Sequence, residues 1–162
     1  MLELPLPSFP TGLVRGRFFP GDGQLYVCGM FSWAGSATYP GGLYRIRVTG
    51  QPMYLVTKLH ASAQKLTLEF TQTLDPSSID PSRVKIKTWS LKRTAEYGSA
   101  HYDEHDLEVT AATLADDGRS LALQIPQLAP TWCMEIAYTF RAADGALVEG
   151  VIHNTIHRLA EN

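Results

Sequence analysis

The sequence predicts an all-β fold whose larger part is a two-layer sandwich. Short runs in which apolar and polar residues alternate recur along the chain, for example Leu66–Phe70, Leu121–Ile125 and Trp132–Phe140. Because successive side chains of a strand point to opposite sides, each run predicts a strand with one buried face. No segment repeats apolar residues at the spacing of an amphipathic helix. Several short strands separated by turn residues are typical of a sandwich or a barrel.

The first 50 residues are rich in glycine and proline and predict a small three-stranded antiparallel β segment. Its expected strands are Leu13–Phe19, Gln24–Phe31 and Leu43–Val48. In the third strand, Tyr44, Ile46 and Val48 are expected on one face. Three strands alone form a marginal unit, so this segment must pack on the sandwich or belong to something larger.

A boundary is expected near Gly50–Pro52, which divides the chain into an N-terminal β segment (1–50) and a sandwich (51–162). Turns are predicted at Asp117–Gly118 and Asp144–Gly145. We expect five alternating residues on the core face of the longest strand: Trp132, Met134, Ile136, Tyr138 and Phe140.

Two further expectations concern the stretch after the predicted strand Val84–Trp89. The polar segment from Leu91 to Asp106 is expected to be the longest connection in the sandwich. Trp89 alternates with the apolar residues of its strand, so its ring is expected to be covered by that same connection.

The composition limits the possible partners. The formal net charge is −2 and charged residues make up 19% of the chain. This balance argues against nucleic acid or an anionic membrane as the main partner, because both attract a basic excess. No apolar run is long enough for a transmembrane helix, and the N-terminus lacks the features of a signal peptide. The two cysteines, Cys28 and Cys133, could form a disulfide or be separate buried thiols.

One resemblance concerns residues 53 to 158. The segments Leu66–Phe70, Leu74–Ile79 and Val84–Ile86, followed by Asp117–Leu123 and Ala143–Gly145, resemble bacterial immunoglobulin-like domains. Those domains occur in large surface and secreted proteins. The resemblance implies an immunoglobulin-like β-sandwich.

A second resemblance covers nearly the whole chain. The segments Phe9–Gly12, Arg15–Phe18 and Asp22–Met30 are similar to the final strands of a β-propeller. The similar proteins are large, planctomycete-type proteins identified as membrane-bound or sorbosone-type dehydrogenases, often joined to c-type cytochrome domains. In them a sandwich follows the propeller, and Tyr97–Ser99 with His105–Asp106 matches its pattern.

This second resemblance implies a context rather than an activity. It implies the C-terminal part of a longer extracytoplasmic protein, periplasmic or extracellular, with upstream propeller and cytochrome domains as partners. The chain has no Cys-x-x-Cys-His haem motif, so no catalytic residue and no cofactor carry over from that family.

A metal site could be formed by His101 and His105. They lie four residues apart with Asp103 and Glu104 between them, and imidazole and carboxylate groups suit zinc, copper or nickel. Two ligands on one loop need a third anchor, and the alternative is a solvated loop held by hydrogen bonds.

Aromatic residues provide a second possible site. Trp33 and Tyr39 lie in a Gly- and Ser-rich stretch, and Tyr102 lies in the polar segment after Trp89. Such side chains could stack on sugar rings or anchor a partner, whereas Trp33 could equally cover an interdomain interface.

No nucleophile motif and no phosphate-binding loop occur in the sequence. We therefore expect a non-enzymatic protein: an accessory, structural or docking module of a larger extracytoplasmic protein. Carbohydrate binding through Trp33, Tyr39 and Tyr102, or a metal or redox accessory site at His101 and His105, are the alternatives.

Overall fold

Three strands pair near the start of the chain in the computed structural model, which describes residues 1, 4, 6–31 and 37–161. They form one antiparallel sheet in the order β1-β2-β3, with bounds β1 (Gly12–Phe18), β2 (Leu25–Met30) and β3 (Gly41–Ile46). The three predicted N-terminal strands are thus confirmed to within a few residues. Tyr44 and Ile46 are half-buried as expected, but Val48 lies beyond β3 and is 90% exposed.

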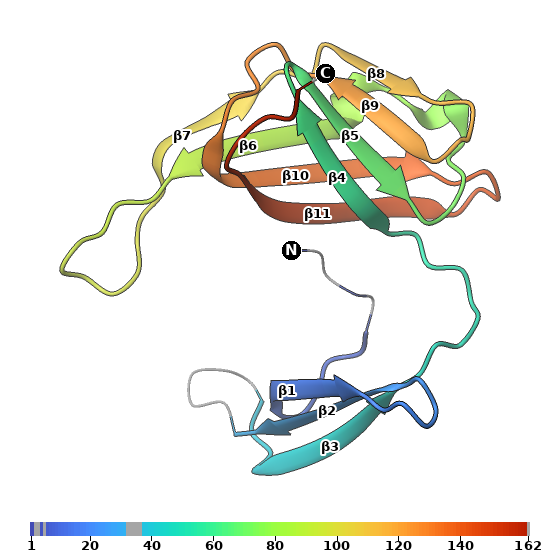
Figure 1. The fold of residues 1–162 in the computed structure, drawn as a ribbon, viewed down its shortest axis with the longest axis vertical. Coiled ribbons are helices and arrows are strands. Elements are labelled where there is room, and N and C mark those ends of the chain that lie inside the picture. Colours follow the sequence, from blue (N-terminus) through green and yellow to red (C-terminus); the bar gives the residue numbers. More distant parts are fainter. Residues whose placement is uncertain (2–3, 5, 32–36, 162) are drawn as a thin grey trace. The chain divides into compact units, whose positions relative to one another are not determined.

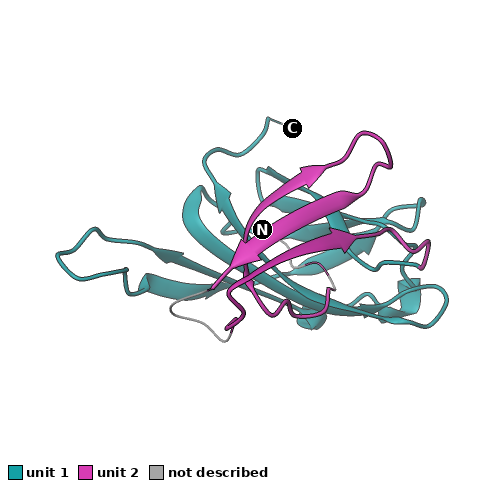
Figure 2. Cartoon of the chain, turned by 90° about the horizontal axis from the view of Figure 1, so that it is seen from below, with its two compact units in different colours: residues 1–3, 52–162 teal, residues 4–51 magenta. Residues whose placement is uncertain are grey.

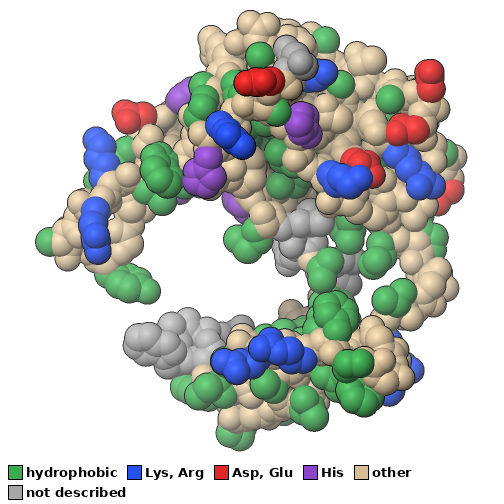
Figure 3. All heavy atoms as spheres, viewed as in Figure 1, with side chains coloured by type: hydrophobic (Ala, Val, Ile, Leu, Met, Phe, Trp, Pro, Cys, Tyr) green, Lys and Arg blue, Asp and Glu red, His purple; other side chains and the backbone are tan. Residues whose placement is uncertain are grey.

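The chain divides into two compact units (Figure 2). One contains Leu4–Gln51, and the other contains Met1–Glu3 together with Pro52–Asn162. In the unit of residues 4–51, the three-stranded unit, Val27 is the buried hydrophobic residue among those described, and large apolar side chains are exposed on the sheet (Figure 3). They include Val14, Phe18, Met30 and Leu43.

The larger unit is a sandwich of two four-stranded sheets (Figure 1). One sheet has the order β4-β5-β9-β8, and its strands are β4 (Val56–Ser62), β5 (Lys65–Phe70), β8 (Ala111–Leu114) and β9 (Ser120–Gln124). The other has the order β11-β10-β6-β7, and its strands are β6 (Val84–Ser90), β7 (Tyr102–Leu107), β10 (Thr131–Arg141) and β11 (Leu147–Ile156). All neighbouring strands in both sheets pair antiparallel.

The strand order is that of an immunoglobulin-like fold. If β4 to β11 are read as strands A, B, C, C′, D, E, F and G, the sheets have the orders A-B-E-D and G-F-C-C′. These are the sheet orders of immunoglobulin domains, in which C′ extends the sheet formed by C, F and G. The predicted all-β, immunoglobulin-like sandwich preceded by a three-stranded segment is therefore confirmed.

The core lies between the two sheets of the sandwich and follows the predicted alternation. Leu66 and Leu68 of β5 and Leu121 and Leu123 of β9 are 0% exposed, and so is Phe140 of β10. Burial of each such side chain contributes about 1.5–3 kcal/mol to stability. Phe70 contacts the rings of Tyr138 and Phe140 edge-on, with centroid distances of 5.5 and 6.3 Å, which is a favoured aromatic geometry.

One expected core residue is not in the core. Met134, Ile136, Tyr138 and Phe140 are buried, but Trp132 is 68% exposed. The pairing of β10 with β11 is irregular between Thr131 and Met134, where three residues of β10 advance against two of β11. The alternation that buries Met134 therefore does not extend back to Trp132, and the prediction for this residue was wrong.

The expected long loop is also shorter than predicted. Residues 102–107 form β7, so the connection after β6 ends at His101. The connection from β5 to β6, residues 71–83, is longer and contains two 3-10 turns, Pro76–Ser78 and Pro81–Arg83. The side chains of Asp75 and Asp80 each accept a hydrogen bond from the backbone at the start of one of these turns.

The predicted turns at Asp117–Gly118 and Asp144–Gly145 are confirmed, and both glycines have positive φ, 65° and 86°. Both cysteines are free thiols, Cys28 exposed and Cys133 half-buried. In the described part of the chain, no helix has the length and apolar character needed to cross a membrane.

Candidate functional site

The β6–β7 ribbon carries the histidines that the sequence singled out. On β6, Val84, Ile86 and Thr88 are buried toward the core, whereas Lys87 and Trp89 alternate with them onto the outer face. His101, just before β7, stacks on the ring of Trp89 with centroids 4.2 Å apart and planes 16° from parallel. Trp89 is thus covered by the connection that follows its strand, as predicted.

Glu104 joins two basic groups on that outer face. One carboxylate oxygen accepts a hydrogen bond from His101 Nδ1 at 2.5 Å, and the other lies 3.0 Å from Lys87 Nζ. The hydrogen bonds from His101 and Lys87 hold the pKa of Glu104 below its usual value. In turn, the hydrogen bond to Glu104 raises the pKa of Lys87. All three groups are partly exposed, so this is a surface cluster that positions His101 over Trp89.

His105 points to the opposite side of the ribbon. It pairs in register with the buried Thr88, and its Nε2 lies 3.2 Å from Thr88 Oγ1. Its Nδ1 lies 2.8 Å from the backbone oxygen of Asp103. A carbonyl oxygen only accepts, so Nδ1 carries the proton and, in the neutral ring, Nε2 accepts from the threonine hydroxyl. Both ring nitrogens of His105 are therefore engaged within the strand pair.

The structure does not bring His101 and His105 together. The pairing of β6 with β7 is irregular between Thr88 and Ser90, and Asp103 there has a positive φ of 54°. This extra residue turns His101 and His105 to different faces. Across the described residues, no three His, Cys, Asp or Glu side chains are grouped so that they could hold a metal ion. An ion bound by both histidines would have to break the hydrogen bonds of each.

A small pocket opens at the end of the sandwich beside His105. Its volume is about 210 Å³. It lies between the ends of β6 and β7 and the connection from β9 to β10, and Trp132 stands at its rim. Its lining consists of Thr88, Trp89, Ser90, Asp103, His105, Leu107, Gln127, Ala129, Pro130, Thr131 and Trp132.

Trp132 is held in place although most of its ring is exposed. The Oγ1 of Thr155 on β11 donates a hydrogen bond of 2.7 Å to the backbone oxygen of Trp132. The ring of His157 meets the indole edge-on with a centroid distance of 6.1 Å. Sequence reasoning missed this residue because alternation alone placed it in the core. The available signal was its position at the start of the strand, two residues after Pro130.

The aromatic residues that the sequence suggested as ligand-binding do not lie at the pocket beside Trp132 in the described part of the chain. Tyr102 is half-buried at the start of β7, where the ammonium of Lys92 lies 4.4 Å from its ring centroid. Tyr39 belongs to the three-stranded unit, is exposed, and donates its backbone N–H to Pro10 at 3.1 Å. Trp33 lies outside the described residues. Tyr102 is not among the residues that line the pocket beside Trp132.

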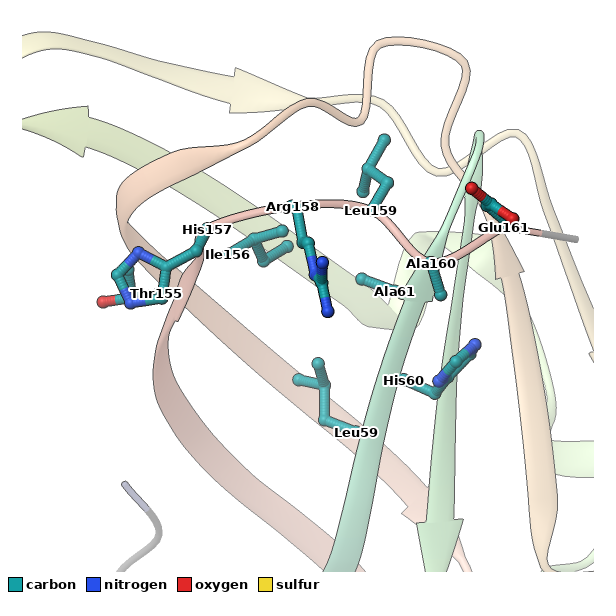
Figure 4. A pocket seen from close by; sticks show the side chains of 10 residues that line it. All are labelled: Leu59, His60, Ala61, Thr155, Ile156, His157, Arg158, Leu159, Ala160 and Glu161. Atoms are coloured by element: carbon teal, nitrogen blue, oxygen red, sulfur yellow. The ribbon is translucent and has the colours of Figure 1, made fainter.

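A second depression lies between β4 and the C-terminal segment (Figure 4). The segment crosses to β4, where the backbone N–H of Ala160 donates to Ala61 at 2.8 Å. His60, His157 and Arg158 line the depression, but their side chains point in different directions (Figure 4). This depression therefore lacks a group of converging polar atoms.

The fold and the site together define an immunoglobulin-like sandwich protein that has a small pocket, rimmed by Trp132, at one end of the sandwich. No family model, no curated protein and no solved structure matches the chain.

Proposed function

We propose that this chain is a non-catalytic docking module of a larger extracytoplasmic protein, and that it binds its partner through the pocket beside Trp132. The observation that carries the proposal is the exposure of Trp132 at the rim of that pocket. Tryptophan is enriched among the few residues that supply most of the binding energy of protein interfaces.

The size of the pocket supports docking over cofactor binding. Pockets for drug-sized ligands and cofactors measure about 300–1,000 Å³. A volume of about 210 Å³ is smaller and fits one anchoring side chain of a partner. Leu107 and Pro130 give the pocket apolar walls, and Ser90 and Gln127 add polar groups that could fix the orientation of a bound segment.

The chemistry of the titratable groups supports a non-catalytic role. The carboxylates with lowered pKa are Asp75, Asp80, Asp117 and Asp144 at turns, and Glu104 in the surface cluster. For the four aspartates the main cause is hydrogen bonding to nearby turn residues or, for Asp144, to Tyr54. In the pocket, His105 uses both ring nitrogens in structural hydrogen bonds. These groups stabilise turns, strand pairing and the stacking of His101 on Trp89.

The partner that the family resemblance suggests is a propeller or cytochrome domain. The test is isothermal titration of this chain with the separately produced propeller domain of a protein of that family. We expect binding that Trp132→Ala weakens by about tenfold or more, as is typical of an interface anchor. Tyr97→Ala is the matched control, since Tyr97 is a fully exposed aromatic outside the pocket. Absence of binding, or equal loss in both variants, would contradict the proposal.

Carbohydrate binding at the same pocket is the second candidate. It is favoured by the juxtaposition of an exposed indole with the polar groups of Ser90, Asp103 and Gln127, a combination suited to a sugar ring and its hydroxyls. A glycan array separates the two functions. Sugar binding that Trp132→Ala abolishes and Tyr97→Ala preserves would favour this candidate over protein docking.

A further inference from the structure

The edge strand β11 is long and has few of the features that protect a strand from pairing with another strand. Its ten residues, Leu147–Ile156, contain no proline, lysine or arginine. Exposed sheet edges attract other strands, and proteins commonly block them with such residues, with bulges, with short strands or with covering segments. Among the described residues, β11 meets a covering residue on its free side at His153, where Met1 pairs with it, and the irregular pairing of β10 with β11 is confined to one end, between Thr131 and Met134.

The other three edges of the sandwich are each protected. β4 carries Lys58, has an irregular pairing beside it, and is joined at its end by Ala160. β7 carries acidic residues and the positive-φ residue Asp103. β8 has only 4 residues. β11 differs from these three edges in combining a length of ten residues with the absence of lysine, arginine and proline.

The backbone of β11 already pairs with a residue on its free side. The N–H of His153 donates to the backbone oxygen of Met1 at 3.0 Å, and the amino group of Met1 donates to the backbone oxygen of His153. The peptide groups of His153 therefore point away from β10. Because this direction alternates along a strand, those of Glu149, Val151 and Thr155 point to the same free side.

We propose that β11 pairs antiparallel with β11 of a second copy of this chain, around a two-fold axis at Val151. In this register Val151 lies opposite Val151 of the second copy, and Glu149 lies opposite its His153. The odd-numbered residues from Leu147 to Thr155 lie opposite one another and direct their peptide groups toward the shared edge, and the residues between them form the non-hydrogen-bonded pairs that alternate with these in an antiparallel ladder. The two β11-β10-β6-β7 sheets become one continuous sheet.

The exposed side chains of β11 select this register over its neighbours. Leu147, Glu149, Val151 and His153 share the outer face of the strand. Shifting the pairing by two residues in either direction places Glu149 opposite Val151 or Thr155 and loses both Glu–His pairs. A Glu149 carboxylate opposite the imidazole of His153 can accept a hydrogen bond from a ring N–H, and Val151, which is 43% exposed, gains an apolar neighbour. In a two-fold dimer a contact between two different residues forms twice, so the Glu149–His153 pair occurs on both sides of the axis.

Met1 occupies one position of this edge. Among the described residues, the pairing of this segment with β11 is that of Met1 with His153, whereas the proposed ladder extends from Leu147 to Thr155. The second copy's strand replaces Met1 at that position, so dimer formation exchanges one pair of hydrogen bonds for a longer series.

Sedimentation velocity of the full chain, from micromolar to several hundred micromolar, tests the proposal. The wild type is expected to form a dimer as the concentration rises. Val151→Lys places two ammonium groups beside the axis and is expected to raise the dissociation constant by about tenfold or more. His60→Lys is the control, because it adds the same side chain to an exposed position of the β4 edge. A wild type that stays monomeric, or a Val151→Lys variant that dimerises as the wild type does, would overturn the proposal.

A charge exchange tests the register. Glu149→Lys removes the carboxylate that faces His153, and His153→Glu places two carboxylates opposite one another, so each is expected to weaken the dimer. The double variant places an ammonium group opposite a carboxylate and is expected to recover dimerisation, with the unfolding midpoint of every variant measured alongside. A double variant no better than the single ones would reject the register with Val151 on the axis.

Discussion

Trp132 and Met134 lie two residues apart on β10, yet Met134 is 1% exposed and Trp132 is 68% exposed. The irregular pairing between Thr131 and Met134 separates them. Trp132 also differs from Phe140, the aromatic residue at the other end of the strand. Phe140 fills the core, whereas Trp132 stands at the rim of a pocket.

This difference predicts unequal costs for the same kind of truncation. Phe140→Ala is expected to lower the free energy of unfolding by about 3–5 kcal/mol, because it leaves a cavity in the core. Trp132→Ala is expected to cost less than about 1 kcal/mol, since a mostly exposed ring contributes little packing. Urea denaturation of both variants measures these values. A Trp132→Ala cost equal to that of Phe140→Ala would place the indole in the core in solution.

Residue-level prediction from the sequence succeeds where strands are regular. Leu66, Leu68, Leu121 and Leu123 are buried as their alternation indicates, because a regular strand repeats its direction every two residues. It fails where one extra residue enters a strand, because hydrophobicity does not encode a bulge. Spacing alone could not show that His101 and His105 face different sides, since the irregular pairing at Asp103 lies between them.

The connection from β6 to β7 illustrates the same limit for whole elements. Sequence polarity predicted a loop from Leu91 to Asp106, but residues 102–107 pair with β6 as strand β7. Polar residues form this strand because it lies at an edge of the sheet, where both its outer face and its free side meet solvent. The longer connection at 71–83 is ordered by its two aspartate-capped turns and by the buried Leu74.

These two connections are expected to differ in their resistance to protease. Every residue from 91 to 101 is exposed, and the segment contains Lys92 and Arg93. Local opening of such a segment disturbs few buried contacts, so trypsin is expected to cleave the sandwich there first. Limited proteolysis followed by intact-mass measurement identifies the first cut. Initial cleavage at Arg83, in the longer connection, would show that length rather than packing controls access.

At the scale of the whole molecule, the two units have unequal means of stabilising themselves. The hydrophobic core cluster draws all its fully buried members from residues between Val56 and Ile156. In the described residues of the three-stranded unit, Val27 is the buried hydrophobic residue, and the unit consists of one sheet. A three-stranded sheet that lacks a packed second layer of its own has little apolar burial to offset the entropy of folding.

We therefore expect the sandwich to fold without the three-stranded unit. A fragment of residues 52–162 is expected to unfold cooperatively, at a midpoint within a few degrees of the transition of the full chain, because it retains the entire core cluster. A fragment of residues 4–51 is expected to show no cooperative transition. Differential scanning calorimetry of both fragments and the full chain measures this. If the sandwich fragment melts more than about 10 °C below the full chain, the three-stranded unit contributes more than about 1–2 kcal/mol to its stability, and the chain must then be treated as one folding unit.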